Sequence, residues 1–301
     1  MPAQRRSLAC TVLARTVLAC TVLVLCALAA ACAKPSSPQG AAAPAAGTAV
    51  QKAPSRDSSL AAVRARGVLV VGTTGDYRPL SFREPATGAW WGFDLEVAAE
   101  IARRLGVACA FEPTSWPALA GDVMEGSRFD LAMGGITATE DRKARMLMSE
   151  GYLANGKTLL CRRQDRWRFR SLADLDRPGV RVMVNPGGLN EQFARRHLTH
   201  AQIIVHPKNE EIPRLVAEGR ADAMVTEITE APWYVKSDPR LAAPLLDRPF
   251  TRGEIAVLLP KGRESLLGEV NRIIASMKAD GTLRRLHAKY GLACAWQVPE
   301  K

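Results

Sequence analysis

The sequence predicts an α/β fold of two lobes, each a mixed sheet flanked by helices, with two crossover segments between the lobes. Strands rich in β-branched residues alternate with helical patterns of about 10 to 15 residues, as in sheets covered by helices on both faces. The alternation is interrupted near residue 157 and then starts again. An apolar segment near residue 254 has the pattern of a strand that returns to the first series. Two crossings imply two lobes, a hinge and a ligand held between the lobes.

The first series begins with a strand and an amphipathic helix. The helix is predicted from Phe93, Val97, Ile101 and Leu105, whose four-residue spacing places them on one face. In chain order the predicted elements are a strand at Gly67–Thr73, a helix at Phe93–Leu105, a strand at Phe129–Gly134 and a crossing segment at Lys157–Arg162.

The second series repeats the strand and helix alternation and is followed by the return to the first lobe. Its predicted elements are a strand at Val180–Val184, a helix at Asn190–His197, a strand at Ile203–His206, a helix at Glu210–Glu218 and a strand at Ala221–Thr226. A returning strand at Glu254–Pro260 and a closing helix at Leu266–Lys278 complete the chain. We therefore assign residues 58–156 and 250–295 to the first lobe and residues 157–249 to the second.

The N-terminus has the pattern of an export signal. Arg5 and Arg6 precede an apolar run over residues 8–31, so residues 1–32 are predicted to be a secretory signal. Small residues before Cys32 resemble a bacterial lipoprotein cleavage site, which makes Cys32 a candidate lipidation site; cleavage after an Ala-x-Ala pattern is the alternative. Residues 33–57, rich in Ala, Pro, Ser and Gly, are predicted to form a disordered tether. We expect a periplasmic or cell-envelope protein.

Positive charge remains after this signal is removed. The formal charge of the whole chain is +11, and loss of Arg5, Arg6 and Arg15 leaves +8 because the signal contains no acidic residue. We identify neither a recognition-helix motif nor a basic stripe interleaved with aromatic residues. The sequence therefore favours an anionic ligand or a membrane surface, rather than nucleic acid, as the partner of this charge.

Several kinds of chemistry lack sequence support. No P-loop, G-x-G-x-x-G or G-x-S-x-G motif is found, so neither a nucleotide cofactor nor a serine nucleophile is indicated. His197 and His200 form H-x-x-H beside two arginines, which we interpret as a solvated helix face rather than a metal site. Cys109, Cys161 and Cys294 remain after processing; one disulfide is possible, with its pairing open.

Two strand-to-helix junctions, residues 131–142 and 181–191, indicate anion binding. Each has a Gly pair that lets the backbone approach a ligand, followed by a helix start whose N–H groups favour a carboxylate. The first junction adds the hydroxyls of Thr137 and Thr139 and the guanidinium of Arg142, which can hold a carboxylate in bidentate fashion. Two such sites at one cleft would suit a small dianionic or zwitterionic metabolite. Two ordinary strand-to-helix turns without a ligand are the alternative.

Four features of the sequence occur together in this order: Gly72–Tyr77, Gly92–Glu96, Gly134–Thr139 and Arg142. With them, residues 58–292 resemble the periplasmic solute-binding proteins of the polar amino-acid class, solute-binding protein family 3. It implies the type II periplasmic-binding-protein-like fold, with two α/β lobes closing over an amino acid. It also implies that Arg142 binds the ligand carboxylate and that Glu227 meets the amino group.

One branch of this family matches more of the residues. The matching segments are Thr73–Tyr77, Pro113–Pro117, Asn155–Thr158, Asn185–Glu191, Phe193–Arg195 and Thr226–Ala231, and together they resemble the periplasmic cyclohexadienyl dehydratases. This resemblance implies a lyase of phenylalanine biosynthesis that converts prephenate to phenylpyruvate, or arogenate to phenylalanine, with loss of water and carbon dioxide and without a cofactor. We also expect no metal. The other function considered is a non-catalytic amino-acid receptor that delivers its ligand to an ABC permease.

The branch resemblance assigns roles to particular residues. Glu230 would be the general acid that protonates the departing hydroxyl, and Asn190 would position this acid or the substrate. A useful acid needs a raised pKa, so Glu230 should lie in the dry part of the cleft. The remaining assignments are Arg142 with Thr137 and the Gly135 loop for one carboxylate, Lys157 with the Asn185–Asn190 helix start for the other, and Tyr77 and Trp116 as walls of the ring.

Simpler interpretations exist for the same residues. Glu230 could be a solvated residue at a helix start, Asn190 with Glu191 a helix cap, and Lys157 a residue that serves only the hinge. Tyr77 and Trp116 could be packing residues, or could stack on the side chain of an amino-acid ligand. The sequence also departs from the branch: Glu227 replaces the usual aspartate and Ile255 an expected lysine. The preference between prephenate and arogenate, the oligomeric state, the lipidation of Cys32 and the effect of these departures stay open.

Overall fold

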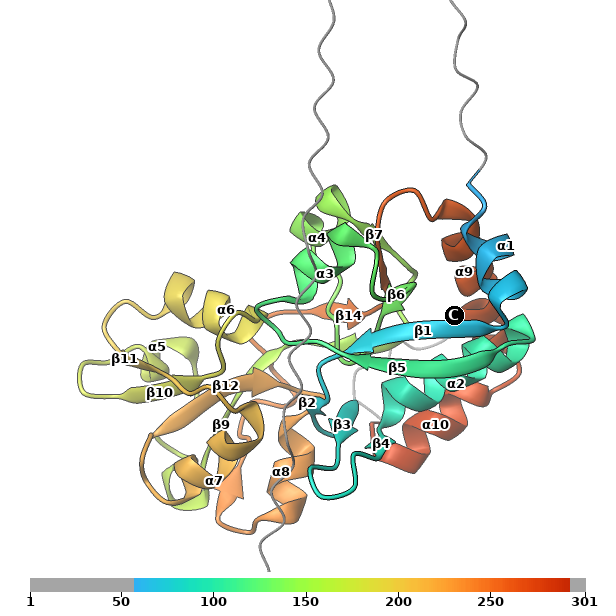
Figure 1. Ribbon diagram of the computed structural model, residues 1–301. Helices are drawn as coiled ribbons and strands as arrows, with labels where there is room; N and C mark the ends of the chain where they lie inside the picture. The colour runs from blue at the N-terminus through green and yellow to red at the C-terminus, as the bar shows by residue number, and fades with distance from the viewer. Residues whose placement is uncertain (1–56, 293–301) are drawn as a thin grey trace, which may run out of the picture. The chain divides into compact units, whose positions relative to one another are not determined.

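The computed structural model describes residues 57–292, which lie within a compact unit formed by residues 54–301. The predicted signal, Cys32, the tether up to residue 56 and Cys294 lie outside the described residues. Figure 1 shows how the described helices and strands are arranged. Within residues 57–292, no helix has the length and apolar character needed to cross a membrane.

The first lobe is built on a mixed five-stranded sheet with the order β5-β1-β6-β15-β7. Strand β1 runs parallel to β5 and β6, whereas β15 runs antiparallel to β6 and β7. The strands are β1 (Val68–Thr73), β5 (Ala108–Pro113), β6 (Leu131–Ala132), β7 (Leu147–Met148) and β15 (Leu258–Leu259). The late strand β15 lies beside β6, so the end of the chain does return to the first lobe.

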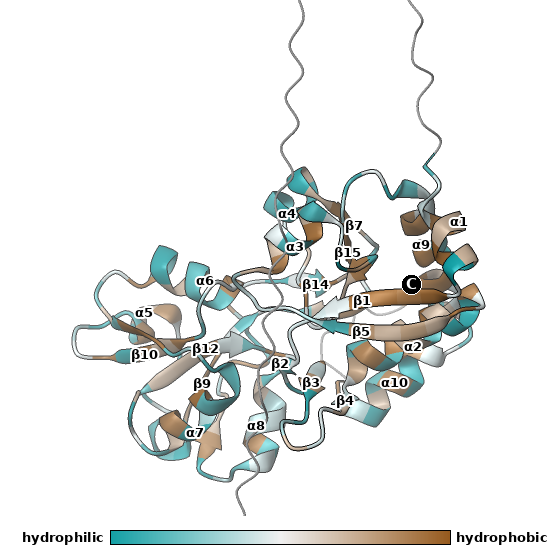
Figure 2. Ribbon diagram, viewed as in Figure 1, coloured by the Kyte–Doolittle hydropathy of each residue, from teal (hydrophilic) through white to brown (hydrophobic). Residues whose placement is uncertain are grey.

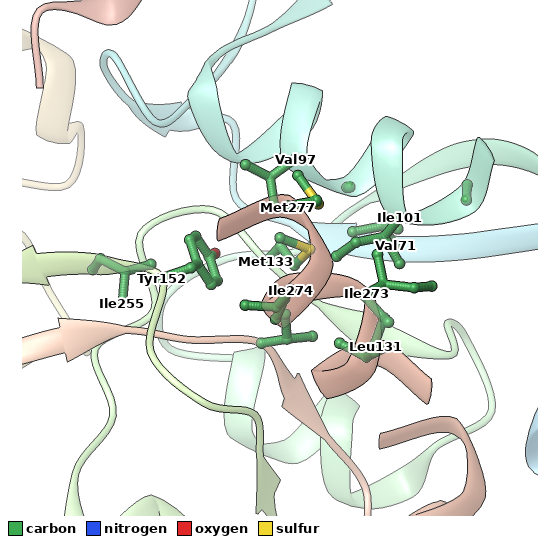
Figure 3. Close-up of a cluster of buried hydrophobic side chains, with 14 of the residues drawn as sticks. Val71, Val97, Ile101, Leu131, Met133, Tyr152, Ile255, Ile273, Ile274 and Met277 are labelled. Atoms are coloured by element: carbon green, nitrogen blue, oxygen red, sulfur yellow. The ribbon is translucent and has the colours of Figure 1, made fainter. Parts of the chain in front are cut away.

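Helices cover both faces of this sheet. Helices α1 (Ser59–Arg66), α2 (Phe93–Leu105), α9 (Glu264–Ala279) and α10 (Thr282–Tyr290) bury their apolar side chains in one core, and α3 (Leu119–Glu125) packs in a second. Figure 3 shows the first of these cores, where Val97 and Ile101 of α2 gather with Ile273 and Met277 of α9 around Val71. Hydropathy follows burial in Figure 2: β1 is brown, whereas the surface helix α4 (Glu140–Arg145) is teal.

The second lobe has a mixed sheet with the order β11-β10-β12-β9-β13. Alternate residues of its strands enter different cores: Leu159 and Cys161 pack with α6, whereas Leu160 packs with α7. The elements are β9 (Lys157–Arg162), β10 (Arg181–Val184), α6 (Leu189–His197), β11 (Gln202–Val205), α7 (Ile212–Ala217), β12 (Ala223–Glu227), α8 (Ala231–Ser237) and β13 (Leu241–Ala242). The predicted fold of two lobes with mixed, helix-covered sheets is confirmed.

Two antiparallel strands, β8 (Leu153–Asn155) and β14 (Gly253–Ile255), form the crossovers between the lobes. The prediction that Lys157–Arg162 is the crossing segment is wrong in position, because this segment is β9 of the second sheet and the crossing comes just before it. The predicted returning strand Glu254–Pro260 is two strands, β14 and β15. A Cβ at Gly156 would overlap the Thr251 carbonyl oxygen, so glycine lets the two crossovers approach.

The predicted helix Phe93–Leu105 has the bounds of α2, and the other long predicted elements are present with shifted ends. The predicted helix Glu210–Glu218 is a 3₁₀ turn, η2 (Asn209–Glu211), followed by α7. Short elements were not predicted because their sequences carry little periodicity. They include a three-stranded sheet, β2 (Asp76–Tyr77), β3 (Ser81–Arg83) and β4 (Trp90–Trp91), as well as η1 (Arg163–Asp165) and α5 (Leu172–Leu175).

Within residues 57–292 the cysteines form no disulfide, and the two histidines of the H-x-x-H motif contact other side chains. Cys109 and Cys161 are free thiols, and burial raises their pKa values to about 11 and about 12. His197 stacks on the Phe193 ring and His200 pairs with Asp176. Residues 57–292 hold no group of three or more His, Cys, Asp or Glu side chains that could bind a metal ion.

Candidate active site

A cavity of about 320 Å³ is lined by side chains from both lobes. The lining contains every residue that the sequence predicts to bind the substrate, together with Asn190: Tyr77, Trp116, Gly135, Thr137, Arg142, Lys157, Asn190 and Glu227. Asn185, Gly188, Leu189 and Asn209 also line it. The Asn185–Asn190 segment was predicted as a helix start, but Asn209 was missed because it belongs to no recognisable motif.

Arg142 supplies a positive charge that no carboxylate neutralises directly. It lies in α4, and its Nη1 donates to the Thr137 carbonyl oxygen at 2.6 Å. Within residues 57–292 the guanidinium forms no ion pair, and burial lowers its pKa. Desolvation without a matching anion is costly. A ligand carboxylate would provide that anion and accept the remaining N–H groups.

The polar groups of the first junction are arranged differently from the prediction. The backbone N–H groups of Gly134 and Gly135 both donate to Asp94 Oδ2, the former at 2.9 Å, so they do not face a ligand. The Thr139 hydroxyl accepts from the Arg142 N–H and caps α4. The N–H groups of the Gly pair and the Thr139 hydroxyl therefore already have partners within the protein, although Gly135 still lines the cavity. Thr137 and Arg142 of this junction line the cavity and remain candidates for contact with a ligand.

Lys157 and Glu227 form a buried ion pair at the cavity wall. Lys157 Nζ donates to Glu227 Oε1 and to Asn190 Oδ1, each at 2.6 Å. The Tyr77 hydroxyl donates to the other oxygen of Glu227, and Thr137 donates to Oε1 at 3.3 Å. Burial raises the pKa of Glu227, but the Lys157 ammonium and these hydrogen bonds outweigh it and hold the pKa below its usual value. Lys157 therefore belongs to the cavity and does more than support the hinge.

The second junction brings the two lobes into contact. Helix α6 starts after Gly188, so the interpretation of Asn190 as a helix cap is wrong. The Asn190 side chain instead joins Lys157 to Asn185, donating to Asn185 Oδ1 at 3.3 Å. Gly187 has a positive φ of 75°, and a Cβ there would lie 2.7 Å from Pro117 Cα in the first lobe. Glycine at this position lets the lobes close.

Tyr77 and Trp116 form an aromatic wall. Their ring centroids are 5.9 Å apart in an edge-to-face arrangement, and Trp116 Nε1 donates to Asp76 Oδ1 at 3.0 Å. A Cβ at Gly135 would overlap the Tyr77 ring, which explains the glycine. Ile255 is fully buried in the core of the first lobe and is absent from the cavity lining, so no charge replaces the lysine expected there.

Glu230 is fully buried, which makes its interpretation as a solvated residue wrong. It lies just before α8 and accepts hydrogen bonds from Thr226, from Asn209 Nδ2 at 2.9 Å and from the Tyr234 hydroxyl at 3.3 Å. Burial raises its pKa to about 8, and the negative charge of Glu227 adds to the shift. Glu230 is not among the residues that line the cavity. Asn209, which does line it, is its hydrogen-bond partner on that side.

The sequence of the chain is similar to those of known proteins. Residues 69–293 match the family described as bacterial extracellular solute-binding proteins, family 3. The chain belongs to this family. It is 39% identical over 230 residues to the cyclohexadienyl dehydratase of Pseudomonas aeruginosa, covering 76% of this chain and 85% of that protein. It is 30% identical over 228 residues to an L-cystine-binding protein of Escherichia coli, covering 76% and 84%.

Solved structures of family 3 proteins share the fold. An ancestral amino acid-binding protein, described as a precursor of cyclohexadienyl dehydratase, is similar with a TM-score of 0.71 and 35% identity, covering 77% of this chain and 98% of that chain. An arginine-bound binding protein of Streptococcus pneumoniae gives a TM-score of 0.70 and 27% identity, covering 76% and 97%. The predicted family and fold are therefore confirmed, and the relatives include both binding proteins and a dehydratase.

Proposed function

We propose that this family 3 protein is a cyclohexadienyl dehydratase that acts on prephenate, arogenate or both. The observation that carries the proposal is Glu230, a buried carboxyl group with a pKa of about 8. Its hydrogen-bond partner Asn209 lines the same cavity as Arg142. A receptor needs hydrogen-bonding partners at this place. An enzyme that removes a hydroxyl group needs an acid that still holds its proton at neutral pH, and burial provides one. The identity to a dehydratase supports the same conclusion.

The reaction needs one proton and two anion-binding groups. The ring carboxylate leaves as carbon dioxide, and the electrons of its C–C bond complete the aromatic ring while the C–O bond to the ring hydroxyl breaks. That hydroxyl takes the Glu230 proton and leaves as water, and solvent later reprotonates the carboxylate. In the occupied site the substrate hydroxyl replaces Asn209 as the partner of Glu230 Oε1. Atoms balance, since prephenate gives phenylpyruvate, carbon dioxide and water.

The other cavity residues would hold the substrate in position for this step. Arg142 and Thr137 bind one carboxylate, Lys157 binds the other, and Tyr77 and Trp116 lie against the ring. Asn190 keeps Lys157 in place through its 2.6 Å hydrogen bond. Glu227 lowers the cost of burying Lys157 and, by its charge, keeps the pKa of Glu230 high. Without Lys157, the second substrate carboxylate would face the negative charge of Glu227.

A non-catalytic amino-acid receptor for an ABC permease is the second function, and the relatives that bind amino acids favour it. Arg142 and the aromatic wall would serve such a ligand equally well. The deciding experiment incubates residues 54–301, the unit that contains all the cores, with prephenate at neutral pH. Phenylpyruvate is followed by its alkaline absorbance against a control without protein. Product well above the control establishes the dehydratase; no product, with a thermal shift on adding amino acids, establishes the receptor.

The predicted export signal extends this proposal to the cell envelope. The family is described as extracellular, and we propose that residues 1–32 direct export to the periplasm and that a lipid on Cys32 anchors the protein. Expression of the full chain with Cys32→Ser tests this. We expect the variant in the soluble envelope fraction and the unchanged chain in the membrane fraction; equal distribution of the two would exclude the anchor.

Activity and stability should both depend on pH through Glu230. Turnover should be constant below pH 8 and fall above it, because the acid loses its proton there.

In the unfolded chain this glutamate titrates near 4.5, so between pH 4.5 and 8 the native state holds one more proton. The free energy of unfolding should therefore fall as pH rises through this window, by up to about 5 kcal/mol for this group. Urea denaturation at several pH values measures it, and Glu230→Gln should remove this component.

Gly187→Ala should weaken ligand binding by roughly tenfold or more, because its Cβ would push Pro117 and the first lobe away. Gly179→Ala is a matched control, since Gly179 also has a positive φ of 82° but no atom lies within 4 Å of its Cβ position. Both variants should lose about 1 kcal/mol of stability from backbone strain. Calorimetric titration with the ligand measures the affinity of each variant. Equal affinities would show that contact between the lobes at Gly187 does not control binding.

A further inference from the structure

We propose that a basic, tryptophan-bearing surface on the second lobe docks the protein on an anionic phospholipid membrane. The surface follows β9 and comprises residues 162–170, whose sequence is Arg-Arg-Gln-Asp-Arg-Trp-Arg-Phe-Arg. This segment is a basic stripe interleaved with aromatic residues, so the prediction that the chain has none is wrong. It has five arginines and one aspartate, and it takes no part in the cavity described above.

The arginines of this surface differ in how far their charge is compensated. Arg162 is held by Asp165 and Asp222, and Arg168 lies 3.5 Å from Asp165. In contrast, Arg163 donates to the Pro239 carbonyl oxygen and Arg166 to the Arg163 carbonyl oxygen. Neither Arg163 nor Arg166 forms an ion pair within the described residues 57–292. The segment therefore presents positive charge that is available to an external anion.

A shallow hollow gathers part of this charge. Its volume is about 720 Å³, and Arg162, Arg163, Arg166 and Arg240 line it together with Gly219 and its neighbours. The acids near it already have partners: Glu218 pairs with Arg214, and Asp238 pairs with Arg240. Guanidinium groups that project into one hollow suit phosphate oxygens, which they can hold in bidentate fashion.

Trp167 is the observation that favours a membrane. The residue is 69% exposed, which is unusual for the largest apolar residue, and the Arg166 guanidinium lies 4.8 Å from its ring centroid. Tryptophan beside arginine is typical of the boundary between lipid headgroups and acyl chains, where the ring is half buried and the cation meets phosphate. Nucleic acid would need the same charge, but the chain belongs to an extracellular family. The neighbouring Phe169 is buried and anchors the segment to its own core.

The test is co-sedimentation of residues 54–301 with two kinds of lipid vesicle: phosphatidylcholine alone, and phosphatidylcholine with one-third phosphatidylglycerol. We expect binding to the anionic vesicles only. Arg163→Gln with Arg166→Gln should weaken it by roughly thirtyfold, from the loss of two surface cations. Trp167→Ser should also weaken binding. Prephenate turnover should be unchanged in both variants, because the surface is separate from the cavity.

A matched control removes the same charge elsewhere. Arg83 is exposed and also lies over a tryptophan, at 5.2 Å from the Trp90 ring centroid, and Arg284 is exposed on α10. Arg83→Gln with Arg284→Gln should bind anionic vesicles like the unchanged protein. Equal binding by the two double variants, or equal binding to both vesicle types, would overturn the proposal. So would loss of vesicle binding in millimolar inorganic phosphate at constant ionic strength, which would indicate a site for small anions, or binding of duplex DNA in place of vesicles.

Discussion

Glu230→Gln should lower turnover by about a hundredfold to ten-thousandfold, the usual contribution of a general acid, while ligand affinity stays within about tenfold. Glutamine keeps the size and the neutral charge that Glu230 has at pH 7; its Oε1 can still accept from Asn209, and its Nε2 can donate to the Thr226 hydroxyl in place of the present bond. Only the transferable proton is lost. Single-turnover kinetics with prephenate, together with calorimetric titration of the same variant, separate the chemical step from binding. Unchanged turnover would remove Glu230 from the mechanism.

Glu227→Gln distinguishes the two buried glutamates of this site. Glu227 is an anion paired with Lys157, so its loss should weaken binding and disturb the cavity without removing the acid. Because the Glu227 charge raises the pKa of Glu230, the fall in turnover with rising pH should move to a pH below 8 in this variant. The Glu230→Gln variant should show no such inflection. A profile that loses its inflection in Glu227→Gln instead would assign the acid to Glu227.

Arg142→Met should reduce kcat/KM for prephenate by roughly a hundredfold or more, the usual cost of a buried, charge-assisted contact to a carboxylate. The guanidinium forms no ion pair within residues 57–292, so we expect a ligand carboxylate to pair with it. Arg142→Lys keeps the charge but loses bidentate geometry and should recover only part of the effect. Steady-state kinetics measure both variants.

Arg145→Met is the control for this prediction. Arg145 lies in the same helix, is exposed, and has Asp141 as its nearest acid at 3.8 Å. Its loss should change kcat/KM little, which shows that α4 tolerates a methionine. If Arg142→Met and Arg145→Met behaved alike, Arg142 would have no special role in recognising the substrate. The receptor hypothesis also requires Arg142, so this pair tests the cavity and not the choice of function.

Part of the candidate site could be predicted from the sequence because its motifs lie at the ends of strands. Arg142, Lys157 and Glu227 come from such motifs, and the cavity contains all three. Asn209 lies in a short 3₁₀ turn with no motif, and only folding brings it between Glu230 and the cavity. The acceptor of the Gly134 and Gly135 N–H groups was also not predicted, since Asp94 lies forty residues earlier in the chain than Gly134.

The sequence by itself determined the two-lobed α/β class, the family and the residues that come together in the cavity, because periodicity and motifs are local properties. Tertiary structure alone decided which polar groups remain available to a ligand. The amides of Gly134 and Gly135 are taken by Asp94, and Glu227 is taken by Lys157, whereas Arg142 keeps an uncompensated charge. It also decided the pKa of Glu230, because desolvation depends on every atom packed around a carboxyl group and not on its neighbours in sequence.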